Sequence, residues 1–251
     1  MAVAKLVYYG AIAALALVLA GILLAYLHLV APLTGFLFFI ISFFLSLIGV
    51  IVGLIAIVVT RTPERRVARP HALIGTVISL AIALPIITMV VRGMKYPPIN
   101  DITTDVDSPP EFVFALTIPQ NQGRDMKYDK AKYAARQQAG YGIIAPLKER
   151  IEPSAAFARV LDVAQKIPTW KVTYSDPSKN TLEAVATSKL FHFQDDVIVE
   201  IRPSPDGASL IEMRSKSRDG TGDFGVNRRR LRRFFGRIAL SRGPSDNEDM
   251  P

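Results

Sequence analysis

The residues with the most evident chemistry form one run near the C-terminus. Arg214–Arg228 reads RSKSRDGTGDFGVNR and combines arginines with glycines and an aspartate. A guanidinium group binds phosphate or carboxylate through paired hydrogen bonds, and backbone amides at a helix start add to such a site. One interpretation is therefore an anion-binding site. Its expected members are Arg214, Ser215, Arg218, Asp223, Asn227 and Arg228.

A structural network is the alternative for the same run. Arg214 or Arg218 would then pair with Asp195, Asp196 or Asp223 and hold the loop in place. Adjacent side chains on a strand point to opposite faces, so Asp195 and Asp196 are poor joint ligands for a metal ion. We expect these two aspartates to pair with arginines, and we expect no metal and no cofactor. The anion site and the network both remain open from the sequence.

Catalytic groups are scarce in the polar part of the chain. Cysteine is absent, and His192 is the only histidine after residue 91, which excludes a histidine-rich zinc site. A hydrolase or transferase would have to use carboxylates together with Arg214 and Arg218. The carboxylates available for this are Glu183, Asp195, Asp196 and Glu200. A pocket joining two of them with Arg214 would favour the enzyme, whereas a closed ion-pair network would favour a binding or structural module.

Antiparallel strands are predicted to position these residues. The expected strands are Trp170–Tyr174, Leu182–Phe193, Val197–Arg202 and Leu210–Lys216, with Phe112–Ile118 as a further short strand. Alternation places Glu212, Arg214 and Lys216 on one face of the last strand. Glu200 and Arg202 share a face of the neighbouring strand, so Glu–Arg pairs across the strands are expected.

Two helices are predicted around this sheet. Ser154–Ile167 has apolar residues at helical spacing and ends before Pro168. A C-terminal helix follows Asp223, which is suited to capping it. Its buried face is expected to hold Leu231, Phe234, Phe235 and Ile238, and its exposed face Arg228, Arg229, Arg230, Arg232, Arg233 and Arg237. Gln120–Gly142 reads as a long loop with some helix. The fold class is therefore α+β, with a small antiparallel sheet packed against helices.

The first 91 residues predict membrane helices. Lys5 is the only charged residue before Arg61. A helix of about 20 apolar residues crosses a bilayer, and segments 6–30, 34–59 and 72–91 qualify. The glycine step Gly49–Gly53 suits close helix packing, either inside this bundle or at a dimer seam.

The arginines predict the orientation of the helices. The loop Thr60–His71 holds four arginines and one glutamate, whereas the loop around Pro32 holds no charge. The positive-inside rule places Thr60–His71 and the N-terminus in the cytoplasm. The remainder is then expected in the periplasm, on a bacterial inner membrane: a linker at 92–111, an α+β domain at 112–242 and a disordered tail at 243–251.

The charge distribution suggests a partner for the C-terminal helix. The chain has a net charge of +8, and much of the basic charge after residue 91 is crowded into that helix. Nucleic acid is not expected in the predicted compartment. The expected partners are the lipid bilayer itself and either an anionic lipid or an envelope polyanion. Protein partners are left open by the sequence.

Several motifs resemble a known family. Ile99–Asp105 reads INDITTD, Pro109–Phe112 reads PPEF, and Phe193–Val197 reads FQDDV. Together with Arg214–Arg228, these motifs resemble domain-of-unknown-function family 1499, over about residues 97–240. The resemblance implies the domain boundaries and is compatible with three N-terminal membrane helices, but it implies no activity. The expected function is therefore that of a membrane-tethered periplasmic module for binding or accessory work in the envelope.

Overall fold

The computed structural model describes residues 1–242, which form two compact units. The first unit comprises Met1–Gly93 together with Lys189–His192, and the second begins at Met94 and holds the remaining described residues. Each unit has hydrophobic clusters of its own. The tail predicted for 243–251 lies outside the described residues.

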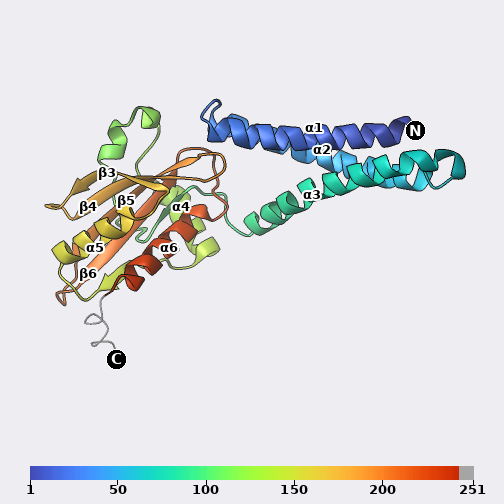
Figure 1. Ribbon diagram of the computed structural model, residues 1–251. Helices are drawn as coiled ribbons and strands as arrows, with labels where there is room; N and C mark the ends of the chain where they lie inside the picture. Colours follow the sequence, from blue (N-terminus) through green and yellow to red (C-terminus); the bar gives the residue numbers. More distant parts are fainter. Residues whose placement is uncertain (243–251) are drawn as a thin grey trace. The chain divides into compact units, whose positions relative to one another are not determined.

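Three long apolar helices make up most of the first unit (Figure 1). They are α1 (Ala2–Tyr26), α2 (Pro32–Val59) and α3 (Arg69–Gly93), and the short 3-10 helix η1 (Pro63–Ala68) precedes α3. Each is long and apolar enough to cross a membrane, with η1 and α3 forming one span. Many large apolar side chains are exposed, among them Leu19 at 58% and Ile51 at 62%. An exposed apolar surface of this extent is favourable in lipid and unfavourable in water. This agrees with the prediction of three membrane helices.

The glycine step of α2 packs inside this bundle. Added Cβ atoms at Gly49 and Gly53 would overlap the side-chain oxygens of Ser79 and Thr76 on α3. Small residues at these positions let the two helix backbones approach closely. The structure therefore uses the Gly49–Gly53 step within one chain, which is the first of the two alternatives that the sequence allowed.

The second unit is a six-stranded antiparallel sheet with helices around it. Its strands are β1 (Asp101–Thr103), β2 (Leu147–Glu149), β3 (Trp170–Asp176), β4 (Thr181–Thr187), β5 (Gln194–Pro203) and β6 (Ser209–Ser217). Its α-helices are α4 (Lys130–Tyr141), α5 (Pro153–Gln165) and α6 (Val226–Leu240), and its 3-10 helices are η2 (Phe114–Thr117) and η3 (Pro119–Asn121). The strand order is β1-β6-β5-β4-β3, and β2 also pairs with β6. This arrangement confirms the predicted α+β class.

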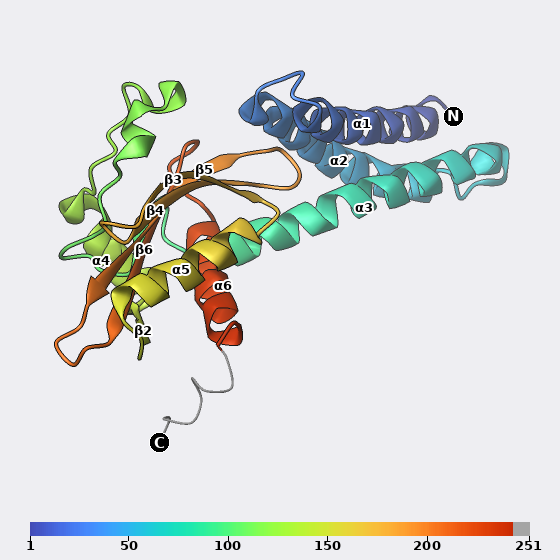
Figure 2. The same ribbon diagram turned by 60° about the vertical axis from the view of Figure 1, so that its left-hand side comes forward.

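The two faces of the sheet have different neighbours. Figure 2 shows α5 and α6 on one face and the segment through η2 and η3 on the other. Val197 and Met213 point towards the helices and share the main core with Phe157 of α5 and Phe234 of α6. Because side chains alternate along a strand, the charged residues between these positions point to the second face. We call this second face the polar face.

Part of the segment expected to be a linker belongs to the sheet instead. Within 92–111, β1 pairs with β6, and Ile99 and Ile102 are fully buried. The prolines and aspartates of this range suggested a loop, but the two isoleucines carry it into the core. Gln137 of α4 then bonds both backbone groups of Thr103, which satisfies the edge of this short strand.

The strand predicted at Phe112–Ile118 is wrong. The chain there turns into η2, and the backbone N–H groups of Val113, Phe114 and Ala115 donate to the Glu183 carboxylate. These donors are therefore not available for a neighbouring strand. The short apolar run Phe112–Ile118 resembles a buried strand, because periodicity cannot distinguish a strand from a helical segment over so few residues.

Candidate functional site

A buried ion-pair cluster occupies the centre of the polar face. Arg214 of β6 and Asp101 of β1 form paired hydrogen bonds, Nε to Oδ1 at 2.9 Å and Nη2 to Oδ2 at 2.8 Å. Lys216 adds a second cation 2.9 Å from Asp101. The Arg214 guanidinium also donates to the backbone oxygens of Pro110 and Met126. Arg214 therefore fastens the covering segment to the sheet.

Asp196 is the centre of a second cluster on the same face. Arg218 donates to both Asp196 oxygens, from Nη2 at 2.7 Å and from Nε at 3.1 and 3.2 Å. Arg124 and Asn121, which follow η2, each donate to Asp196 at 3.1 Å. Asp196 is almost fully buried. The predicted pairing of Arg218 with an aspartate is present, and Arg124 is a partner that the sequence did not indicate.

A third cluster lies on the opposite face, under α6. Ser215 donates to Asn227, and Arg230 bonds Asp195, Asn227 and Ser215. Arg230 was expected on the exposed face of the helix, and this expectation is wrong. Its position lies beside the buried stripe of α6, where the carboxylate of Asp195 attracts it.

Asp223 caps the first turn of α6. Its carboxylate accepts hydrogen bonds from the backbone N–H groups of Gly225 at 2.9 Å and Asn227 at 2.7 Å, and from the Tyr141 hydroxyl. Burial raises the pKa of Asp223, although these hydrogen bonds oppose the shift. Arg228 lies over the ring of Tyr141. The amides that an external anion would use are therefore already bonded to an aspartate.

The six residues of the predicted anion site do not meet in one place. Ser215, Asp223 and Asn227 lie on the α6 side, whereas Arg214 and Arg218 lie on the polar face. The sheet separates the two groups because residues 214 and 215 alternate across it. Arg218 is paired with Asp196, one of the aspartates that the network interpretation named, whereas Arg214 is paired with Asp101, which that interpretation did not include.

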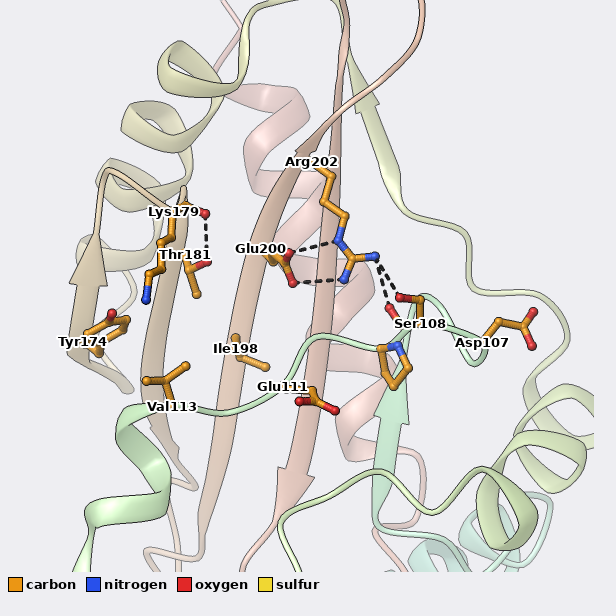
Figure 3. Close-up of a pocket in the computed structure, with 11 residues that line it drawn as sticks. Asp107, Ser108, Glu111, Val113, Tyr174, Lys179, Thr181, Ile198, Glu200 and Arg202 are labelled. Atoms are coloured by element: carbon orange, nitrogen blue, oxygen red, sulfur yellow. Dashed lines mark hydrogen bonds and ion pairs between the residues drawn. The ribbon is translucent and has the colours of Figure 1, made fainter.

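An open cleft lies on the polar face beyond these clusters (Figure 3). Its volume is about 600 Å³. One wall is the segment before η2, and the other walls come from β3, β4 and β5. The lining residues are Asp107, Ser108, Pro109, Glu111, Val113, Tyr174, Lys179, Thr181, Ile198, Glu200 and Arg202. Of the carboxylates considered for catalysis, only Glu200 lines it.

Arg202 organises the charges at one side of the cleft. It forms paired hydrogen bonds with Glu200 at 3.0 and 3.1 Å, and it donates to the backbone oxygen of Ser108. Its Nη1 also lies 2.9 Å from Oε2 of Glu212, an ion pair without hydrogen-bond alignment. The predicted Glu–Arg pair across the strands is therefore present as Arg202 of β5 with Glu212 of β6. Glu212 lies directly opposite Glu200, the other partner of Arg202.

Glu212 is a buried carboxyl beside the cleft. Burial raises its pKa to about 7, with Asp105 and Glu200 adding to the shift and Arg202 opposing it. Two glutamates therefore share one arginine, and the second of them gains or loses its proton near neutral pH. Glu183 supports the far wall, where its carboxylate holds the start of η2 and burial raises its pKa.

The remaining charged residues of the cleft are Asp107, Glu111 and Lys179. No ion pair involves Lys179 or Glu111 within residues 1–242, whereas Asp107 pairs with the exposed Lys130 at 2.6 Å. The ring of Tyr174 stacks against Phe114 at a centroid distance of 6.4 Å. The cleft therefore offers an ammonium group, a carboxylate and an aromatic edge around a fixed Glu–Arg pair, which suits a small polar ligand.

The comparison with known families covers this second unit. A family model described as a protein of unknown function (DUF1499) matches residues 101–238, which is more than half of the chain. The match spans β1 to α6 and so contains the ion-pair clusters and the cleft. No curated protein matches the sequence. The chain belongs to the DUF1499 family of proteins of unknown function.

Proposed function

We propose that this protein is a membrane-anchored module of the bacterial envelope whose periplasmic domain binds a small polar ligand in the cleft of the polar face. The observation that carries the proposal is the contrast between the cleft and the rest of the charged residues. The closed ion pairs of the polar face already occupy Arg214, Arg218 and Asp196. The cleft is lined instead by Lys179 and Glu111, which belong to none of these pairs. A concave cavity with a few convergent polar groups is the usual form of a small-molecule binding site.

The orientation of the chain supports the periplasmic placement. The arginines of Thr60–His71 lie in and beside η1, between the second and third apolar spans. Short loops rich in arginine stay in the cytoplasm. An odd number of crossings then leaves the domain after Met94 on the other side of the inner membrane.

Binding is favoured over the hydrolase or transferase alternative by where the carboxylates lie. Asp195 points towards α6 and Asp196 towards the polar face, and each has arginine partners. Glu183 is held by backbone amides. Of these four carboxylates only Glu200 lines the cleft, and its two oxygens are bonded to Arg202. These carboxylates cannot act together on one substrate in this arrangement.

Native mass spectrometry of the full chain, extracted from its own membrane in mild detergent, tests the proposal. Ser108→Trp places a large ring in the cleft from an exposed position, without touching the core. Ser178→Trp adds the same ring at the β3–β4 turn, outside the cleft, and is the matched control. We expect a bound small molecule on the natural protein and on Ser178→Trp, and its loss from Ser108→Trp. A natural protein without a bound molecule, or equal retention in all three, would contradict cleft binding.

A further inference from the structure

The outward side of α6 is a concentrated basic surface. Arg229, Arg232, Arg233 and Arg237 form no ion pair with any carboxylate within residues 1–242. By contrast, Arg230 on the sheet side of the same helix pairs with Asp195. Four like charges on one helix face repel one another. An anionic partner would relieve this repulsion.

Apolar side chains lie at both ends of this basic surface. Phe224 and Val226 at the start of α6 are 47% and 40% exposed, and Leu240 at its end is 88% exposed. The apolar stripe of the helix itself, which includes Leu231 and Phe234, is used by the sheet. The helix therefore cannot insert into a bilayer along its length. Arginines flanked by a few apolar side chains suit the headgroup layer of a membrane.

The path of the chain supplies an independent reason for a membrane partner. The apolar helix α3 ends at Gly93, and Tyr96 follows after two residues. The ring of Tyr96 lies against Gly225, where an added Cβ would come within 2.8 Å of it. Three residues span at most about 11 Å. Only Met94 and Lys95 therefore separate the last residue of the third apolar span from Tyr96, which packs against the residue before α6.

We propose that the outward face of α6 (Arg229, Arg232, Arg233 and Arg237, with Phe224 and Leu240) binds the anionic lipid headgroups of the membrane that anchors the chain. Arginine recognises a lipid phosphate through paired hydrogen bonds. A basic segment beside a membrane span is attracted by the negative surface potential over about a Debye length. The contact is largely electrostatic because the apolar stripe of α6 is already buried.

A label on α6 in lipid nanodiscs tests this contact. The chain has no cysteine, so Gly236→Cys introduces one thiol at the centre of the outward face. An added Cβ atom there meets nothing within 4 Å. The full chain carries a fluorophore at this position, and the nanodiscs contain phosphatidylcholine alone or with phosphatidylglycerol, plus a lipid whose headgroup quenches the fluorophore. We expect quenching in the anionic discs, little in the neutral discs, and its loss at about 1 M salt.

Charge variants separate this contact from general attraction. Replacing Arg229, Arg232 and Arg233 together by glutamine should abolish the quenching, and replacing them by lysine should keep most of it. Replacing Lys127, Lys130 and Lys132 by glutamine changes the net charge equally on another part of the domain and should leave the quenching intact.

Three outcomes would overturn the proposal. The first is equal quenching in neutral and anionic discs. The second is full quenching of the label at position 236 in the variant whose three arginines are replaced by glutamine. The third is that a dissolved polyanion such as heparin prevents the quenching of the label, while the quenching itself does not depend on lipid charge. That last result would assign the surface to a soluble polyanion.

Discussion

Arg214 and Asp101 form a bidentate ion pair in which both side chains are fully buried. The pair joins β6 to β1 through two residues that lie 113 positions apart in the sequence. Arg214 also holds the covering segment through Pro110 and Met126. The fully buried guanidinium of Arg214 thus holds β1 against β6 and positions the segment that forms one wall of the cleft.

We expect Arg214→Ala to destabilise the second unit by about 3–5 kcal/mol, because a buried aspartate loses its main partner. Lys216 remains beside Asp101, which places the expected value at the lower end of that range. The measurement is the urea midpoint of a fragment beginning at Met94. Arg232→Ala, on the exposed face of α6, is the control and should change stability by less than about 0.5 kcal/mol. A loss below about 1 kcal/mol in Arg214→Ala would mean that the pair does not hold the fold.

Removing Arg218 tests the second cluster. Arg218→Ala takes away three hydrogen bonds to Asp196, but Arg124 and Asn121 stay in place. We therefore expect a loss of about 1–3 kcal/mol, less than for Arg214→Ala. Unchanged stability in the same urea titration would reopen Arg218 as a residue that awaits an external anion.

Arg230→Ala should also destabilise the fold, because the nearly buried carboxylate of Asp195 then has no cationic partner in this ion pair. The expected loss is again about 1–3 kcal/mol. Arg233→Ala, three residues further along α6, removes the same side chain from the solvent side and is the control. Equal stability of the two variants would place Arg230 on the solvent side, against the structure.

The domain should lose stability as the pH rises through the range in which Glu212 ionises. Its pKa is about 7 in the folded chain against an ordinary 4.5, so between these values the folded state holds a proton that the unfolded state has released. Stability from this group is full below about pH 4.5 and is lost as the pH passes 7. Glu212→Gln has no such proton to lose.

The measurement is the difference in unfolding free energy between Glu212→Gln and the natural fragment. This difference should shift in favour of the variant by about 1–3 kcal/mol from pH 5 to pH 8. Glu111→Gln, at an exposed position of the cleft, is the control and should show no such trend. A difference that is constant with pH would show that Glu212 titrates normally.

Packing of the membrane helices can be tested with matched glycine variants. Gly53→Leu should lower the yield of folded full-length protein in detergent, because any side chain there overlaps Thr76 of α3. Gly10→Leu makes the same change on α1, where an added Cβ meets nothing within 4 Å, and should be tolerated. Normal yield of Gly53→Leu with loss of an oligomer would instead assign the glycine to a dimer seam.

Local patterns predicted β3 to β6, α5 and α6, and the faces of the strands. Alternation placed Glu212, Arg214 and Lys216 on one side of β6, and the pair between Arg202 and Glu212 follows from it. The helix predicted at Ser154–Ile167 is α5, with ends displaced by one or two residues.

Partners far apart in the sequence could not be predicted in this way. Asp101 lies in a range rich in proline and aspartate. Periodicity does not predict which strand this segment will pair with. The cleft depends on how the segment before η2 crosses the polar face, which is set by Glu183 and Arg214 together. The one available signal was the isoleucine pair Ile99 and Ile102, whose apolar character argues against a plain linker.

The proposed periplasmic placement of the second unit, after three membrane crossings, can be tested by thiol labelling of intact cells with a membrane-impermeant maleimide. Because the chain has no cysteine, each variant carries a single thiol. Ser178→Cys, at the exposed β3–β4 turn, should be labelled in intact cells. Arg66→Cys, in η1, should be labelled only after the cells are broken open. Labelling of Arg66→Cys but not of Ser178→Cys in intact cells would place the domain in the cytoplasm and contradict the account.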